Sequence, residues 1–169
     1  MRKVLLSVIL VGWSILLYAQ YEGMEYYREQ DPAVQAKLEQ WQDLKFGFFV
    51  HWGPYSQKGY CESWTICTED VDWIQRDTII SYDEYYRNYV NLKKTFNPVK
   101  FNPEYWADLA KEAGMKYFVF TTKHHDGFCM WDTRETDYKI TSEECPFHTA
   151  PNADVVKELF RAFGERDFM

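Results

Sequence analysis

Two short apolar runs stand out in the chain after residue 20. Residues 46–50 read FGFFV without a charge, and residues 115–122 read MKYFVFTT. An apolar run of this length is typical of a strand covered on both faces, as in a parallel sheet. We therefore predict two strands of one parallel sheet.

Amphipathic stretches surround these runs, and each has a recognisable start. Polar caps, prolines and capping-box spacing mark the first turn of a helix. The start signals are Asp31 with Pro32, Ser81 with Glu84, and Asn102 with Pro103. Gly114 ends the third predicted helix, and a fourth runs from about Asp154 to Gly164. The first is predicted as a surface helix, and the second as a helix with its tyrosines on one face.

The elements follow the order strand, long loop, helix, strand, long loop, helix. This alternation predicts an α/β protein with right-handed crossovers and a parallel sheet, either an open doubly wound sheet or a (β/α)8 barrel. No GxGxxG or P-loop follows either strand, which argues against nucleotide binding. A complete barrel needs about 250 residues. A chain of 169 residues therefore predicts a partial (β/α)8, TIM-like barrel consisting of its amino-terminal strand–helix units.

The first residues have the layout of a signal peptide. Arg2 and Lys3 precede an apolar stretch, 4–18, which ends at Ala19. A membrane anchor needs about 20 apolar residues, and this run is shorter. We predict a signal peptide at 1–19, an amino-terminal extension with a short helix at 20–43, and a truncated barrel at 44–169. The mature protein is expected to be secreted or periplasmic, without a membrane segment.

Composition and cysteine content narrow the classes of partner. The net charge is -7 and basic residues occur singly, so the chain lacks the basic patch that nucleic acids require. A neutral or small polar ligand suits this surface better. Export permits disulfides, but four cysteines allow three pairings, and buried free thiols are an equal alternative. The cysteines are Cys61, Cys67, Cys129 and Cys145, and no CxxC or Cys/His zinc spacing occurs among them.

Polar side chains follow both predicted strands. His51 ends the first, and His124 with His125 follows the second. The carboxyl ends of parallel strands meet at one edge, where ligands bind. Glu62 and Trp64 lie in the loop that leaves this edge. Imidazoles and a carboxylate can bond hydroxyl groups, and an indole can cover a C–H face, so this set favours a sugar.

Two other interpretations of the histidines stay open at this point. They could be structural groups that cap the strands, or they could bind a metal ion. A metal site would need a third or fourth ligand besides the histidines. Asp126 directly follows His125 in the sequence, so it cannot complete such a ligand set alone. We expect Asp126 to orient the loop or a histidine. No metal and no organic cofactor is predicted.

Several blocks together resemble the exo-α-L-fucosidases of glycoside hydrolase family 29. The blocks are FGFFVHWGPYS, ESW, FNPEYWADLAKEAGMKYFVFTTKHHDGFCMWDT and the DVVKELFRAF helix. The resemblance runs from about Phe46 to Met169. It implies a (β/α)8-like barrel that removes terminal α-L-fucose from glycans or glycoconjugates with retention of configuration.

The resemblance also implies roles for single residues. His51, His124 and His125 would hydrogen-bond fucose hydroxyls, and Glu62 and Trp64 would line the same pocket. Here the motif reads Glu-Ser-Trp, whereas many members have Glu and Trp adjacent, so either Glu62 or its serine neighbour takes the carboxylate's place.

The catalytic pair is expected outside the chain. Retaining glycosidases use two carboxyl groups about 5 Å apart. In the family that the chain resembles, the nucleophile and the acid/base would both lie beyond Met169. The alternatives to an enzyme fragment are a non-catalytic sugar-binding module and a metal-dependent hydrolase.

Overall fold

The computed structural model describes residues 29–68, 74, 76 and 79–169. The predicted signal peptide, 1–19, lies outside these residues. The chain divides into two units, Met1–Glu39 and Gln40–Met169. Within the part of the chain that the structure describes, no helix is both long and apolar enough to cross a membrane.

Helix α2, Pro32–Leu44, begins where the sequence predicted. The carboxylate of Asp31 accepts a hydrogen bond from the backbone N–H of Ala33 at 2.8 Å, which satisfies one of the free donors of the first turn. None of its residues is buried, so the surface helix is confirmed. Near its end, Trp41 meets the ring of Tyr117 at 5.6 Å between centroids.

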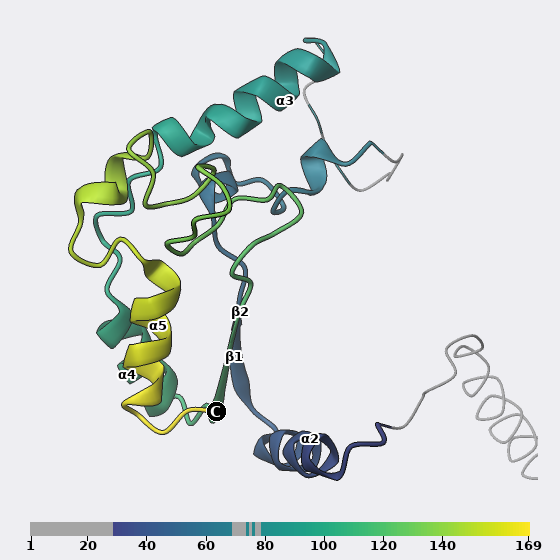
Figure 1. The fold of residues 1–169 in the computed structure, drawn as a ribbon, viewed down its shortest axis with the longest axis vertical. Coiled ribbons are helices and arrows are strands. Elements are labelled where there is room, and N and C mark those ends of the chain that lie inside the picture. Colours follow the sequence, from purple (N-terminus) through teal and green to yellow (C-terminus); the bar gives the residue numbers. More distant parts are fainter. Residues whose placement is uncertain (1–28, 69–73, 75, 77–78) are drawn as a thin grey trace, which may run out of the picture. The chain divides into compact units, whose positions relative to one another are not determined.

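Two strands, β1 at Gly47–Val50 and β2 at Tyr117–Phe120, pair in parallel (Figure 1). The register places Phe48 opposite Phe118, and Val50 opposite Phe120. Gly47 stands opposite Tyr117, and a Cβ at this glycine would lie 2.2 Å from the tyrosine ring. Only glycine therefore lets this ring cross the neighbouring strand.

Three further helices lie along the crossover and after β2. They are α3 at Tyr82–Val90, α4 at Pro103–Glu112 and α5 at Val155–Gly164. The predicted caps are confirmed: Ser81 accepts from the N–H of Glu84, and Asn102 accepts from the N–H of Tyr105. Each cap satisfies a backbone donor that the helix cannot, so the start of the helix is encoded locally. Short 3-10 turns at Pro54–Lys58, Trp64–Ile66, Asn91–Lys94 and Pro146–Thr149 connect the elements.

The core lies between one face of the sheet and helices α4 and α5. Phe118 stacks on Phe163 of α5 with 3.8 Å between centroids, and Phe48 meets Trp106 of α4 at 6.4 Å. In Figure 1 both helices lie on the same side of the strands. Leu159 of α5 is completely buried in this cluster. The larger of the two core clusters in the described residues lies on this face.

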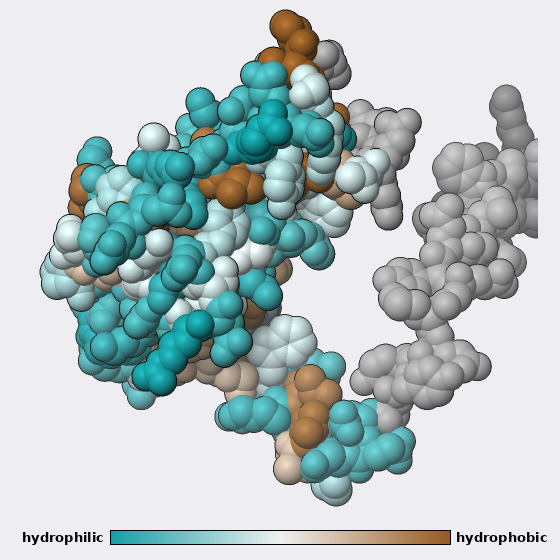
Figure 2. Space-filling view, turned by 45° about the horizontal axis from the view of Figure 1, so that its top comes forward, coloured by the Kyte–Doolittle hydropathy of each residue, from teal (hydrophilic) through white to brown (hydrophobic). Residues whose placement is uncertain are grey.

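The other face of the sheet corrects a prediction. Both strands were expected to be covered on both faces, but the side chain of Phe49 is 62% exposed and that of Val119 is 37% exposed. Strand side chains alternate, so these residues point away from α4 and α5. A two-stranded sheet with helices on one side leaves the opposite side open. Elsewhere, hydrophilic residues dominate the surface in view, and hydrophobic ones form separate patches (Figure 2).

The last residue pairs with the second strand. The N–H of Phe118 donates to the carbonyl of Met169 at 2.9 Å, and the N–H of Met169 donates to the carbonyl of Lys116 at 3.1 Å. The N–H of Thr121, three residues on from Phe118, donates to Val50 of β1. Because backbone groups alternate in direction along a strand, Met169 lies on the edge of β2 away from β1. Met169 therefore pairs in parallel with β2 on its free edge, although the sheet of the described residues consists of two strands.

Two sequence expectations need adjustment in detail. All four cysteines are free thiols, Cys129 and Cys145 being buried, so of the two alternatives the structure has thiols rather than disulfides.

In α3, Tyr85 and Tyr89 are buried as expected, but Tyr82 and Tyr86 are exposed. The apolar face of this helix is narrower than its tyrosine content indicated, because only residues four apart reach the core.

Candidate functional site

The two strands deliver three histidines to one edge. His51 directly follows β1, and the N–H of Thr121 extends the ladder by donating to Val50 at 3.0 Å. The chain then continues from β2 to His124 and His125. We call His51, His124 and His125 the histidine rim. Their position at the carboxyl ends of parallel strands is where ligand sites form in such sheets.

A tight turn shapes the segment after β2. Gly127 has φ +83°, a conformation that favours glycine, and its N–H donates to the carbonyl of His124 at 3.0 Å. Asp126 Oδ1 accepts the N–H of Phe128 at 3.0 Å. Lys123 and Cys129 form an isolated bridge that closes the segment. The sequence KHHDGF is therefore a closed turn, which carries the histidines out of the strand.

The rings of the rim are in mutual contact. Ring centroids lie 5.5 Å apart for His51 and His124, and 4.8 Å apart for His124 and His125. Trp64 lies 5.2 Å from His125, so the predicted indole joins the cluster. A hollow of about 550 Å³ opens here. Its lining residues are His51, Thr121, Lys123, His124, His125 and Gly127.

Sequence reasoning missed the role of Ser63. Its side chain is buried, and its Oγ lies 2.5 Å from Nδ1 of His124. Glu62 is half-buried with a positive φ of 41°, and its carboxylate accepts from the thiol of Cys61 at 3.3 Å. Among the described residues, the hydrogen bond to the rim thus comes from Ser63 and not from Glu62. The only signal in the sequence was the extra residue inside the ESW motif.

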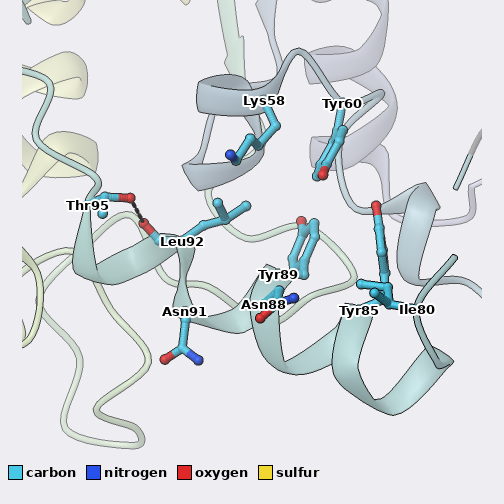
Figure 3. A pocket seen from close by; sticks show the side chains of 9 residues that line it. All are labelled: Lys58, Tyr60, Ile80, Tyr85, Asn88, Tyr89, Asn91, Leu92 and Thr95. Carbon is cyan, nitrogen blue, oxygen red and sulfur yellow. Dashed lines mark hydrogen bonds between the residues drawn. The ribbon is translucent and has the colours of Figure 1, made fainter. Parts of the chain in front are cut away.

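A second missed residue is Tyr89. Its ring is 2% exposed, and its hydroxyl donates to Asp126 Oδ2 at 2.8 Å. Figure 3 shows Tyr89 and Tyr85 projecting from the same side of α3. The sequence placed Tyr89 in the core, which is correct. A buried tyrosine usually finds a partner for its hydroxyl, and that rule was the available signal.

The electrostatics keep the centre of the rim neutral. Burial lowers the pKa of His124, and the charge of His125 lowers it further, whereas Asp126 and Glu62 act in the opposite direction. Burial and the charge of Asp126 raise the pKa of Tyr89, so its phenol stays protonated and donates. A neutral imidazole offers one donor and one acceptor, which suits a hydroxyl-bearing ligand.

A metal centre finds no support in the described residues. Among residues 29–68, 74, 76 and 79–169, no group of three or more His, Cys, Asp or Glu side chains could hold an ion. Asp126, the carboxylate next to the rim, accepts hydrogen bonds at both oxygens from protein groups. Its role in the structure is to hold the turn, as the sequence led us to expect.

Comparison with known proteins identifies the family. A sequence profile described as Alpha-L-fucosidase matches residues 16–169. The chain belongs to the α-L-fucosidase family. The match begins well before Phe46, where the resemblance had been placed.

Two curated members of the family show how much of an α-L-fucosidase is present. A putative α-L-fucosidase of Caenorhabditis elegans is 31% identical over 90% of this chain and 31% of its own length. The tissue α-L-fucosidase of Rattus norvegicus is 32% identical over 93% of this chain and 35% of its own length. The chain therefore spans about a third of the curated relatives that it matches.

Solved structures of α-L-fucosidases have a similar fold. One is a family GH29 enzyme from Bacteroides thetaiotaomicron, trapped as a covalent intermediate with 2-fluoro-fucosyl fluoride. It is 31% identical with a TM-score of 0.60, covering 88% of this chain and 31% of that one. Another is an enzyme from Lactobacillus casei in complex with its α-L-fucose product, 32% identical with a TM-score of 0.55 over 78% of this chain and 37% of that one.

Proposed function

We propose that the chain is the sugar-binding, amino-terminal part of an α-L-fucosidase that removes terminal α-L-fucose from glycans or glycoconjugates with retention of configuration. One observation carries the proposal. In a member of this family, the three rim histidines and Trp64 converge at the carboxyl end of two parallel strands. The fucose complex of the Lactobacillus casei relative supports the choice of sugar.

Each residue of the site has a role that follows from its chemistry. His51, His124 and His125 hydrogen-bond the hydroxyls of fucose, since neutral imidazoles both donate and accept. Trp64 covers the C–H face of the sugar, and Glu62 adds an acceptor near His124. Binding of this kind fixes the orientation of the sugar before the glycosidic bond is broken.

The parent protein is proposed to be a (β/α)8 barrel. The covered face of the sheet meets helices, as the outside of barrel strands does, and the open face with Phe49 and Val119 suits a barrel interior. Met169 pairs in parallel with the outer edge of β2 through two backbone hydrogen bonds, which leaves this edge suited to a further strand. Together with the family's length, these features support further strand–helix units after Met169.

The chemistry would be a double displacement. A carboxylate attacks the anomeric carbon while an acid protonates the leaving oxygen, and water then hydrolyses the glycosyl-enzyme. The covalent intermediate of the Bacteroides thetaiotaomicron relative supports this route. Asp126 is committed to Tyr89 and Phe128, so it is not the nucleophile. We place both catalytic carboxyl groups beyond Met169 and expect the 169-residue chain alone to show no turnover.

The test measures hydrolysis of an aryl α-L-fucoside by the complete enzyme, with NMR of the first-formed fucose anomer. We expect release of α-L-fucose and at least a tenfold loss of kcat/KM in His125→Ala, which removes a direct contact. His125 is exposed, so this change spares the core. The matched control is His148→Ala, whose ring contacts the carbonyl of Cys145 away from the rim. Equal activity of His125→Ala and His148→Ala, or turnover by the 169-residue chain alone, would contradict the proposal.

Export of the protein is proposed on the basis of residues 1–19, which have a basic start, an apolar centre and Ala19 at the end. Amino-terminal sequencing of the mature protein tests it. A mature chain that begins near Gln20 is expected, and a mature protein that retains residues 1–19 contradicts it.

A further inference from the structure

Two buried residues contact the rim or the turn that carries it: Ser63 through Nδ1 of His124, and Tyr89 through the carboxylate of Asp126. We propose that Ser63 and Tyr89 are positioning residues: Ser63 fixes the proton of His124 on Nε2, and Tyr89 fixes the turn that carries both His124 and His125. The inference deepens the proposed function and rests on it, because it says how the fucose-binding imidazoles are held. Neither residue needs to touch the sugar.

Tyr89 acts through Asp126. Its hydroxyl donates to Oδ2 at 2.8 Å, while Oδ1 accepts from the N–H of Phe128 at 3.0 Å. One carboxylate therefore ties α3 to the backbone of the turn that contains His124 and His125. Hydrogen bonds to a charged group are the stronger kind. Since Tyr89 is 2% exposed, water does not replace this bond when the hydroxyl is removed.

Ser63 acts on the ring of His124 itself. Its Oγ is buried and lies 2.5 Å from Nδ1, its only hydrogen-bond contact among the described residues. A buried hydroxyl needs an acceptor for its hydrogen, and Nδ1 is the acceptor present, so Ser63 donates. The neutral ring of His124 then carries its own proton on Nε2. That nitrogen is left to donate to a hydroxyl oxygen of the sugar.

The chain contains a matched control for each residue. Tyr85 lies one turn before Tyr89 on the same side of α3, is 5% exposed, and its hydroxyl has no partner among the described residues (Figure 3). Thr65 lies two residues after Ser63, is 4% exposed, and its hydroxyl also lacks a partner there. Removing these hydroxyls changes a buried site of the same kind without breaking a hydrogen bond to the turn or to His124.

The experiment compares Tyr89→Phe with Tyr85→Phe, and Ser63→Ala with Thr65→Val, in the complete enzyme. The first readout is the Kd of L-fucose by calorimetry, together with KM and kcat for an aryl α-L-fucoside. The second is the NMR spectrum of enzyme labelled with 15N-histidine in the absence of sugar, which reports the tautomer of His124. Thermal melts record stability for all four variants.

We expect Tyr89→Phe and Ser63→Ala each to raise the Kd of L-fucose roughly tenfold, the size of one lost hydrogen bond to a charged or well-placed group. The control variants should change it less than twofold. The wild-type spectrum should show the Nε2–H tautomer of His124, and Ser63→Ala should show a mixture of tautomers.

Two results would overturn the inference. One is equal effects of a variant and its control on the Kd, and the other is a wild-type His124 that carries its proton on Nδ1. An enzyme that binds no fucose contradicts the proposed function. The tautomer measurement still decides the role of Ser63 in that case, because it needs no sugar.

Discussion

The two faces of the β1–β2 sheet differ in how far their side chains are buried. On one face, Phe118 is buried against Phe163 of α5. On the other, Phe49 is 62% exposed and Val119 is 37% exposed. Both faces carry apolar side chains. An apolar strand sequence therefore shows that a face can be buried, but the face is buried only where another element of the fold packs against it.

The largest expected effect concerns the open face as a whole. The 169-residue chain alone should associate or lack a cooperative thermal melt, since it exposes apolar strand residues and an unpaired edge. The complete enzyme should be monodisperse and melt cooperatively. Size-exclusion chromatography and a thermal melt followed by near-UV circular dichroism make the measurement. A monomeric, cooperative melt of the chain alone would mean that the open face is a stable surface.

A pair of phenylalanine substitutions sharpens the comparison. Phe49 and Phe160 are both more than half exposed, at 62% and 53%. In a closed barrel Phe49 becomes interior, so Phe49→Ala in the complete enzyme should lower the free energy of unfolding by about 3–5 kcal/mol. Phe160 lies on α5 and touches Phe118 only at an edge, so Phe160→Ala should cost about 1 kcal/mol or less. Denaturant unfolding gives both values. Similar losses of unfolding free energy in the two variants would contradict the burial of Phe49 inside a closed barrel.

The smallest expected effect is the pH dependence of the free energy of unfolding, to which the histidine rim should contribute and the covered face should not. Cys145 is buried in the cluster of the covered face, and burial raises the pKa of its thiol, so this thiol does not titrate between pH 5 and 8. At the rim, burial lowers the pKa of His124. The unfolded chain, with a histidine pKa near 6.5, then binds the proton more readily than the folded chain does.

The contribution of His124 to the free energy of unfolding is therefore fully present above about pH 6.5. It is lost as the pH falls through the lower pKa of folded His124. Denaturant unfolding between pH 7.5 and 5 should show this slope in the wild type and a shallower one in His124→Asn. The control is His148→Asn, which should keep the slope of the wild type. A slope that is unchanged in His124→Asn would assign the pH dependence to other groups.

The helix starts and the strands could be predicted because their causes are local. Asp31, Ser81 and Asn102 cap the first turns of their helices through residues two or three positions away. The apolar runs at 46–50 and 115–122 contain both strands, whose parallel pairing also follows from the helices between them. Three of the five predicted site residues, all histidines, meet for the same reason, since each closely follows a strand.

Tertiary structure alone decided what holds those histidines. Ser63 and His124 are 61 residues apart, and Tyr89 and Asp126 are 37 apart. The local sequence does not tell which of Ser63 and Glu62 contacts His124, or which of Tyr85 and Tyr89 contacts Asp126, because both contacts are long-range. The partner of a buried hydroxyl depends on which distant segment is packed against it. Sequence thus determined the elements, the family and the chemistry at the strand ends, whereas long-range packing chose the side chains that orient it and left one face of the sheet open.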